Sequence, residues 1–350
     1  MPLILKFWWV GIALVSLFAY LPVIDNFFGW DDFWWLYRTK TLLSDPAQIF
    51  RSEGLYFDPL VYLAFWFDYQ LFGLDYRWYH LTDIAIHIMN GYLLFYFIRL
   101  YSGNALLALI SSLIFASSFA ASDAVLWSSS RVDLLSTLFS LVSLIFFLKY
   151  LKEGRALLYL ASVITFALAL GAKATPIVLP ILFLWIYLKE EGTHKMYKTF
   201  IPFVALILLY FSLLFSASAN SISGRDLYPN IYNYSLALTS IFIPEGLLAK
   251  LNLTFVFLIA YLFLLVAWYL KLSPSLNRTK SISLFMVFLF LSPLLILDEL
   301  KLATPDNIYH ILGSPSHRIY LASTGASMFL GSIILWFYER LNAKKEILTK

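Results

Sequence analysis

The chain has 350 residues, of which 61% are hydrophobic and only 13% are charged, with a formal net charge of +4 and a mean hydropathy of +0.78. Soluble domains hold roughly 45–50% apolar residues, so the composition excludes an ordinary soluble domain and indicates an integral, multi-pass membrane protein. The absence of cysteine excludes disulfides, a cysteine nucleophile and a thiolate metal site.

Long apolar stretches recur along the whole chain. A helix needs about 20 apolar residues to cross a bilayer, and ten stretches are predicted to span: residues 7–24, 79–98, 105–122, 134–150, 156–172, 175–188, 199–216, 251–270, 281–297 and 318–338. The first is predicted to be a retained span, because it is too long for a signal peptide and no small-residue cleavage site follows it. The predicted fold is all-α, with residues 1–350 forming one polytopic membrane domain.

The basic residues predict the orientation, because Lys and Arg near helix ends stay on the cytoplasmic side. With both termini cytoplasmic, fifteen of the 25 basic residues but only five of the 21 acidic residues fall inside. Residues 231–247 are apolar enough to span, but a span there would move the segment from Lys271 to Lys280 outside. They are therefore predicted to form interfacial helix in an outer loop. The expected membrane is a plasma or inner membrane, or the endoplasmic reticulum in a eukaryote.

Three long outer loops follow from this topology, at residues 25–78, 217–250 and 298–317. Long ordered loops in a compact protein are usually functional. The first contains NFFGWDDFWWLYR at 26–38, in which Asp31 and Asp32 stand among seven aromatic residues, followed by an interfacial helix predicted around the Ser-Asp-Pro of residues 44–46. Adjacent side chains point in different directions, so one of the two acids is the functional candidate and the other is a candidate helix cap.

Other ionisable residues fall at the same predicted membrane level. They are His80, Asp83 and His87 on one helix face, Asp123, Arg131 and Asp133 before the fourth span, Lys173 in the turn after the fifth, Arg225 and Asp226 in the second long outer loop, and Arg318 at the tenth span. Such groups cost about 2.5–3.5 kcal/mol each at membrane depth, so they tend to face a cavity or one another. The sequence therefore predicts a polar cavity that opens outward.

Several elements resemble, in the same order, those of membrane glycosyltransferases of the GT-C superfamily, in particular protein O-mannosyltransferases and their relatives with tetratricopeptide repeats. They are WDD at 30–32, YFDPL at 56–60, LFGLD at 71–75, HLTDIAIH at 80–87, WSSSRVDLL at 127–135, GAKATPIVLP at 171–180 and RIYLASTG at 318–325. The chain departs from the family at Asp58, which replaces an Arg, at Ala174, which replaces a Glu, and at residues 119–121, which replace a His-Pro pair. It also lacks the repeats.

The resemblance implies transfer of a sugar from a polyprenyl-phosphate donor to a protein or glycan acceptor at the outer face. Such a reaction needs a base for the acceptor hydroxyl and a cation for the departing phosphate. Asp31 is predicted to be the base and Asp32 its helper. The predicted phosphate ligands are Arg131, Lys173 and Arg318, and the predicted cavity-lining residues are His80, Asp83, His87 and Asp133.

Alternatives remain for four of these residues and for the protein as a whole. His80, Asp83 and His87 are either ligands of a divalent metal, the one cofactor considered, or hydrogen-bonded interior groups. Arg131 either binds phosphate or pairs with Asp133. The whole protein is alternatively a lipid-linked sugar transporter or a non-catalytic subunit of a membrane complex. The expected partners are the donor lipid, the acceptor, membrane lipids and, for a subunit, other membrane proteins; nucleic acid is not expected.

Overall fold

The structure is a computed structural model that describes residues 6–29, 31–50, 57–190, 196–218, 237–241, 274–292 and 319–348. Within these ranges the regular elements are α-helices and short 3₁₀ helices, with no strand, which confirms the all-α prediction for the described part of the chain. The predictions for Arg225, Asp226 and Arg318, for the span at 251–270 and for the outer loop at 298–317 lie outside the described residues.

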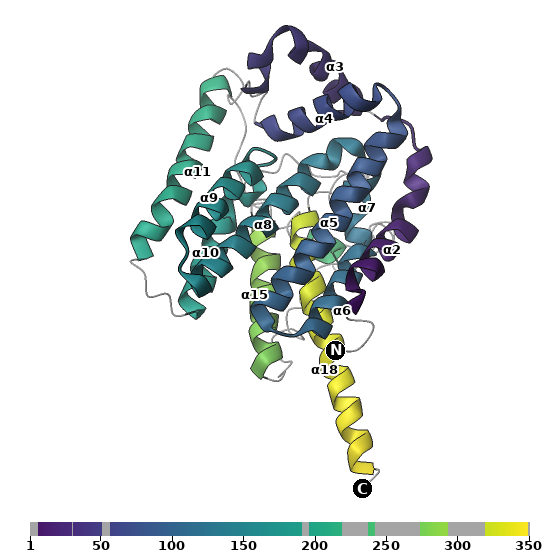
Figure 1. The fold of residues 1–350 in the computed structure, drawn as a ribbon, viewed down its shortest axis with the longest axis vertical. Helices are drawn as coiled ribbons and strands as arrows, with labels where there is room; N and C mark the ends of the chain where they lie inside the picture. Colours follow the sequence, from purple (N-terminus) through teal and green to yellow (C-terminus); the bar gives the residue numbers. More distant parts are fainter. Residues whose placement is uncertain are drawn as a thin grey trace, which may run out of the picture. The chain divides into compact units, whose positions relative to one another are not determined.

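The chain divides into two compact units, each built from separate stretches of sequence (Figure 1). Unit 1 comprises Met1–Ala19, Gly91–Ser122 and Pro229–Lys350, and unit 2 comprises Tyr20–Asn90 and Asp123–Tyr228. Unit 2 therefore contains every candidate site residue that the structure describes.

Unit 2 is built mainly from helices that pack in sequence-adjacent pairs. Its elements are η1 (Leu21–Asp25), α3 (Asp31–Ser44), η2 (Pro46–Phe50), α4 (Pro59–Phe72), the first part of α5 (Tyr76–Ser102), α7 (Ser122–Leu126), η4 (Ser128–Ser130), α8 (Arg131–Glu153), α9 (Ala156–Leu170), η5 (Thr175–Val178), α10 (Leu179–Lys189) and α11 (Met196–Ser218). Helices α8 and α9 pack along one another, and Ser143 and Ser162 each donate a hydroxyl hydrogen bond to the other's carbonyl oxygen, at 2.7 and 3.0 Å. Such interhelical hydrogen bonds suit an apolar surrounding.

An aromatic core lies beneath α3 and α4, which run side by side (Figure 1). Trp35 of α3 stacks on Phe65 of α4 with ring centroids 5.6 Å apart, and Phe28 meets Tyr79 edge-on at 5.1 Å. The aromatic residues of the stretch at 26–38 are therefore divided, because Phe28 and Trp35 are buried whereas Phe27, Phe33 and Tyr37 are exposed. The buried rings fix α3 in place.

The helix pattern of the first outer loop differs from the prediction. Helix α3 begins at Asp31 and ends at Ser44, so the Ser-Asp-Pro segment ends one helix and starts the short η2. Helix α4 was not predicted at all. It begins at Pro59, whose fixed φ suits the first position of a helix, and the apolar stretch that forms it is only 14 residues long.

Four helical stretches of the described residues are long and apolar enough to cross a membrane: Trp8–Asp25, Tyr76–Ser102, Ser128–Glu153 and Tyr320–Asn342. The stretch predicted at 105–122 is broken, because Ala105–Ala116 and Phe119–Leu126 meet at a bend of 56°. At the break, the Ser118 hydroxyl accepts a hydrogen bond from the Ala120 amide, which starts the next turn in a new direction. Three further apolar helices, Ala156–Leu170, Thr175–Lys189 and Lys198–Leu214, are shorter. The total of ten spans stays a prediction.

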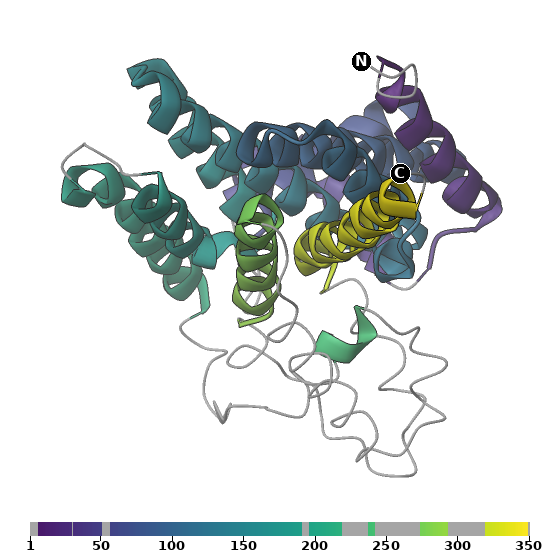
Figure 2. The ribbon, with the colours of Figure 1, turned by 90° about the horizontal axis from the view of Figure 1, so that it is seen from below.

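Unit 1 is a helix cluster with close backbone contacts. Its described elements are α2 (Trp8–Tyr20, except its last residue), the second part of α5, α6 (Ala105–Ala116), η3 (Phe119–Ala121), α15 (Pro274–Leu291) and α18 (Tyr320–Leu348). Helix α18 packs against both α6 and α15, and Figure 2 shows α15 and α18 side by side. A Cβ atom added to Gly325 would lie 2.7 Å from the Ser283 carbonyl oxygen, and one added to Gly331 would lie 2.2 Å from Ser111 Oγ. Both positions need glycine for this approach.

Candidate functional site

The two adjacent acids at the start of α3 have different surroundings. Asp32 is 2% exposed, whereas the Asp31 side chain is exposed and has no hydrogen bond or ion pair to any other described residue. One Asp32 oxygen, Oδ2, accepts a hydrogen bond from the Gly29 amide at 2.9 Å, and the Asp32 amide donates to the Gly29 carbonyl oxygen at 2.8 Å. This reciprocal pattern is a helix N-terminal capping arrangement, so Asp32 holds the start of the helix.

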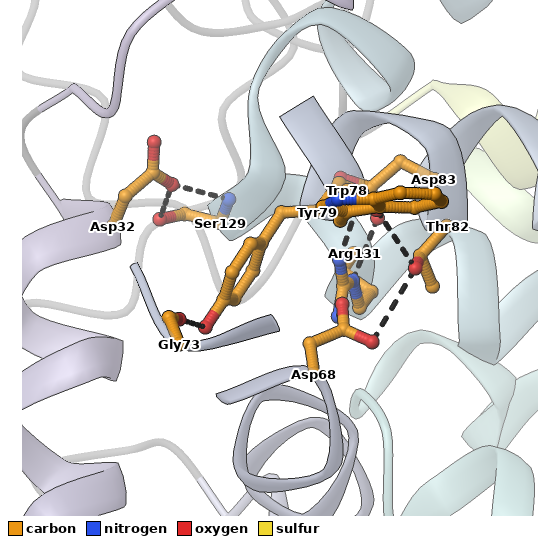
Figure 3. A network of polar contacts seen from close by, with 9 residues as sticks. All are labelled: Asp32, Asp68, Gly73, Trp78, Tyr79, Thr82, Asp83, Ser129 and Arg131. Carbon is orange, nitrogen blue, oxygen red and sulfur yellow. Dashed lines mark hydrogen bonds and ion pairs between the residues drawn. The ribbon is translucent and has the colours of Figure 1, made fainter. Parts of the chain in front are cut away.

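The other oxygen of Asp32 is held by Ser129, 97 positions later in the chain (Figure 3). The Ser129 amide and hydroxyl both donate to Asp32 Oδ1, at 2.7 and 2.5 Å. Ser129 belongs to η4, the turn that directly precedes α8. This contact joins two segments that resemble the family, WDD and WSSSRVDLL.

Arg131, the first residue of α8, is fully buried, and Figure 3 shows its contacts with Asp68 of α4 and Asp83 of α5. Its Nε donates to Asp83 Oδ1 at 2.6 Å, and Nη1 donates to Asp68 Oδ2 at 2.7 Å. Its Nη2 donates to the Tyr79 carbonyl oxygen at 3.1 Å, and its guanidinium lies 4.7 Å from the centre of the Phe65 ring. We name Arg131, Asp68 and Asp83 the arginine triad.

The triad excludes the ion pair considered between Arg131 and Asp133. Residues two apart on a helix point in different directions, and each oxygen of the Asp133 carboxylate instead accepts a hydrogen bond from Lys173. The expectation that Arg131 binds phosphate stays a prediction.

The three residues predicted to share one face of α5 are all buried, but they contact different groups. His80 Nε2 lies 2.9 Å from the Asn26 carbonyl oxygen, and the His87 ring packs edge-on against Tyr20 at 5.0 Å. Asp83 is part of the arginine triad. The described residues include no group of three or more His, Cys, Asp or Glu side chains arranged to hold a metal ion.

A second ionic group lies at the start of α4. Lys173 Nζ donates to both oxygens of Asp133, at 2.6 and 2.7 Å, and the Lys173 side chain is 22% exposed. Asp58 is within electrostatic reach of Lys173, Asp133 and Arg38. The backbone fixes this arrangement, because the Leu60 amide donates to the Gly171 carbonyl oxygen at 2.9 Å. We name Arg38, Asp58, Asp133 and Lys173 the lysine cluster.

Burial changes the protonation of two acids outside the spanning segments. Although the Asp31 side chain is exposed, partial desolvation raises its pKa above the usual value, and the neighbouring charge of Asp32 raises it further. Burial raises the pKa of Asp58 to about 7, and Asp133 adds to the rise, whereas Lys173 and Arg38 oppose it. A carboxyl group with a pKa near 7 exchanges its proton close to neutral pH.

Sequence reasoning missed two residues of this site. Asp68 is the only acid within the apolar helix α4, and this isolation was the available signal for a buried partner. Ser129 gave no such signal, because serines are ordinary in a turn before a helix.

No protein-family model matches the chain, and no curated protein matches it. Among solved structures, the chain is similar to the crystal structure of ArnT from Cupriavidus metallidurans bound to undecaprenyl phosphate. The two share 15% sequence identity with a TM-score of 0.55, over 97% of this chain and 62% of that one. The chain therefore shares the overall fold of this ArnT structure and spans 62% of the length of the ArnT chain.

Proposed function

We propose that the chain is a membrane glycosyltransferase that moves a sugar from a polyprenyl-phosphate donor to an acceptor hydroxyl at the outer face of the membrane. The GT-C fold supports this proposal, and so does the ordered set of GT-C-like sequence elements. The similar ArnT structure was bound to undecaprenyl phosphate, which supports the choice of donor class.

One observation carries the proposal: of the acidic pair, one carboxylate is fixed by hydrogen bonds, and the other has no hydrogen bond to any other described residue. Asp32 is buried and accepts hydrogen bonds on both oxygens, whereas Asp31 beside it is exposed. A general base needs an oxygen that can reach the acceptor hydroxyl. The raised pKa of Asp31 makes it a stronger proton acceptor than an ordinary carboxylate. We therefore assign the general base to Asp31.

The departing phosphate needs positive charge. In the proposal this charge comes from Lys173 of the lysine cluster, which is partly exposed, and from Arg318. Protonation of Asp58 would leave the cluster with one net positive charge, which favours an anionic ligand. Aromatic side chains exposed near the acidic pair, such as Phe27 and Phe33, suit a sugar face or a polyprenyl chain.

The test compares Asp31→Asn with Asp32→Asn in purified protein. Transfer is measured with a panel of undecaprenyl-phosphate sugars, starting with mannose, and donor binding is measured with undecaprenyl phosphate. We expect Asp31→Asn to lower transfer by about 10²–10⁴-fold while leaving binding unchanged. Asp32→Asn should retain more activity, because it changes the residue that holds the start of α3 and leaves the base, Asp31, in place.

Two results would remove the assignment. Full transfer by Asp31→Asn would exclude Asp31 as the base. A wild-type chain that transfers no sugar from the panel, and in which Asp31 becomes inaccessible on binding another membrane protein, would instead favour the non-catalytic subunit.

A further inference from the structure

We infer that Arg131 and Ser129 are positioning residues for the acidic pair and act on the reaction without touching the substrate. The inference rests on the proposed function. It follows from a chain of contacts that runs from the arginine triad through η4 to the first turn of α3.

The first link is the arginine triad. Each nitrogen of the Arg131 guanidinium donates to an internal acceptor: Asp83, Asp68 or the Tyr79 carbonyl oxygen. Arg131 is 0% exposed, so none of these bonds competes with water. Moving Arg131 away from Asp68 and Asp83 would leave buried charges unpaired, which is costly. The first residue of α8 is therefore held firmly against α4 and α5.

The second link is the turn that precedes Arg131. The Ser130 amide donates to the Trp127 carbonyl oxygen at 2.8 Å, which closes η4. Ser129 is 6% exposed, and its amide and hydroxyl both point at Asp32 Oδ1. Hydrogen bonds to a charged acceptor are among the stronger ones in proteins. The anchored turn therefore fixes the Asp32 carboxylate.

The third link is the start of α3. With Oδ1 held by Ser129, Asp32 Oδ2 accepts from the Gly29 amide, and this bond sets where the helix begins. Asp31 lies in the same first turn, so its direction depends on the anchored carboxylate beside it. A base held in advance in its reactive position avoids the cost of reorganisation during the reaction.

This role makes a different kinetic prediction from phosphate binding. Loss of a phosphate ligand weakens donor binding, whereas misplacement of the base lowers kcat with KM for the donor unchanged.

The experiment uses Ser129→Ala, with Ser130→Ala as its matched control. Ser130 is in the same buried turn, and its hydroxyl has no hydrogen-bond partner among the described residues. We expect Ser129→Ala to lower kcat by about 10- to 100-fold with unchanged KM for the undecaprenyl-phosphate sugar. Ser130→Ala should behave as the wild type. Hydrogen exchange at residues 29–36, measured by mass spectrometry, should rise in Ser129→Ala only, because it reports opening of the first turns of α3.

The inference is overturned if Ser129→Ala and Ser130→Ala have equal kcat, or if Ser129→Ala changes KM alone. Failure of the proposed function gives another pattern. In that case the wild-type chain transfers no sugar, while hydrogen exchange at residues 29–36 still separates the two variants.

Discussion

Lys173 donates a hydrogen bond to each oxygen of Asp133, although the two residues are 40 positions apart. The contact joins the turn after α9 to the first turn of α8. Asp133 is 4% exposed and Lys173 is 22% exposed, so solvent screens this pair less than an ion pair at the surface.

The first prediction follows from this pair. We expect Lys173→Met to destabilise the protein, because it leaves the Asp133 carboxylate buried without its cation, and we expect the double variant with Asp133→Asn to recover part of the loss. A double-mutant cycle on thermal unfolding in detergent should give a coupling free energy of about 1–3 kcal/mol. Additive single effects would show that the pair contributes nothing.

The second prediction concerns pH. Asp58 has a pKa of about 7 in the folded protein, against about 3.9 for an unfolded Asp. Between these two pKa values the Asp58 carboxyl keeps its proton in the folded protein but not in the unfolded chain. The contribution of protonated Asp58 to the free energy of unfolding is therefore complete below about pH 4 and is lost as pH rises through 7.

Asp58→Asn should remove this loss, which is at most about 1.4 kcal/mol per pH unit. The variant should therefore gain stability relative to the wild type as pH rises from 4 to 7, in denaturant titrations at each pH. The exposed Asp75→Asn is the control and should follow the wild type. A constant difference between Asp58→Asn and wild type across this range would contradict the assignment.

The third prediction addresses the arginine triad. Arg131→Met leaves Asp68 and Asp83 buried without their cation and should cost about 3–5 kcal/mol, seen as low yield and a lower Tm. The triple variant Arg131→Met, Asp68→Asn, Asp83→Asn removes all three charges together and should recover most of the stability. Equal stability of the single and triple variants would show that the carboxylates do not depend on Arg131.

The fourth prediction concerns the close helix contacts of unit 1. Gly325→Ala would place a Cβ atom 2.7 Å from the backbone carbonyl oxygen of Ser283, so α15 and α18 would have to separate. We expect a loss of about 1–3 kcal/mol in thermal unfolding. Gly11→Ala is the control, since its nearest neighbour would be 3.9 Å away. A stabilising Gly325→Ala would contradict the packing.

The fifth prediction tests the orientation. The chain has no cysteine, so single introduced cysteines report one site each. An impermeant maleimide added outside should label Ser221→Cys and Asn230→Cys but not Lys195→Cys or Lys345→Cys. The reverse pattern would place the acidic pair on the cytoplasmic side.

Four of the predicted spans coincide with long apolar helices of the described residues, because a membrane span must be apolar over its whole length. The prediction at 7–24 and the observed Trp8–Asp25 differ by one residue at each end. Helix α4 was not predicted, because it is short and contains Asp68 among its apolar residues. Asp68 is compatible with a buried helix because it forms an ion pair with Arg131.

The site shows the same limit of local reasoning. Residue types and periodicity predicted Asp31, Asp83, Arg131 and Lys173 at one membrane level, and the structure has all four in unit 2. Pairing depends on contacts that no local pattern encodes, since Arg131 meets an acid 63 positions earlier and Asp32 meets a serine 97 positions later. Arg131 and Asp133, two positions apart in the chain, thus belong to different ionic groups, the arginine triad and the lysine cluster.

The interleaving of the two units along the chain has a consequence for biosynthesis. Unit 2 is complete once residue 228 has left the ribosome, whereas unit 1 has to wait for α18 near the end of the chain. Chains acquire structure from the N-terminus as they are made. The acidic pair, the arginine triad and the lysine cluster can therefore assemble in the membrane while α6 still lacks its neighbour α18, and a nascent chain stalled with residue 228 just outside the ribosome should already protect the first turn of α3.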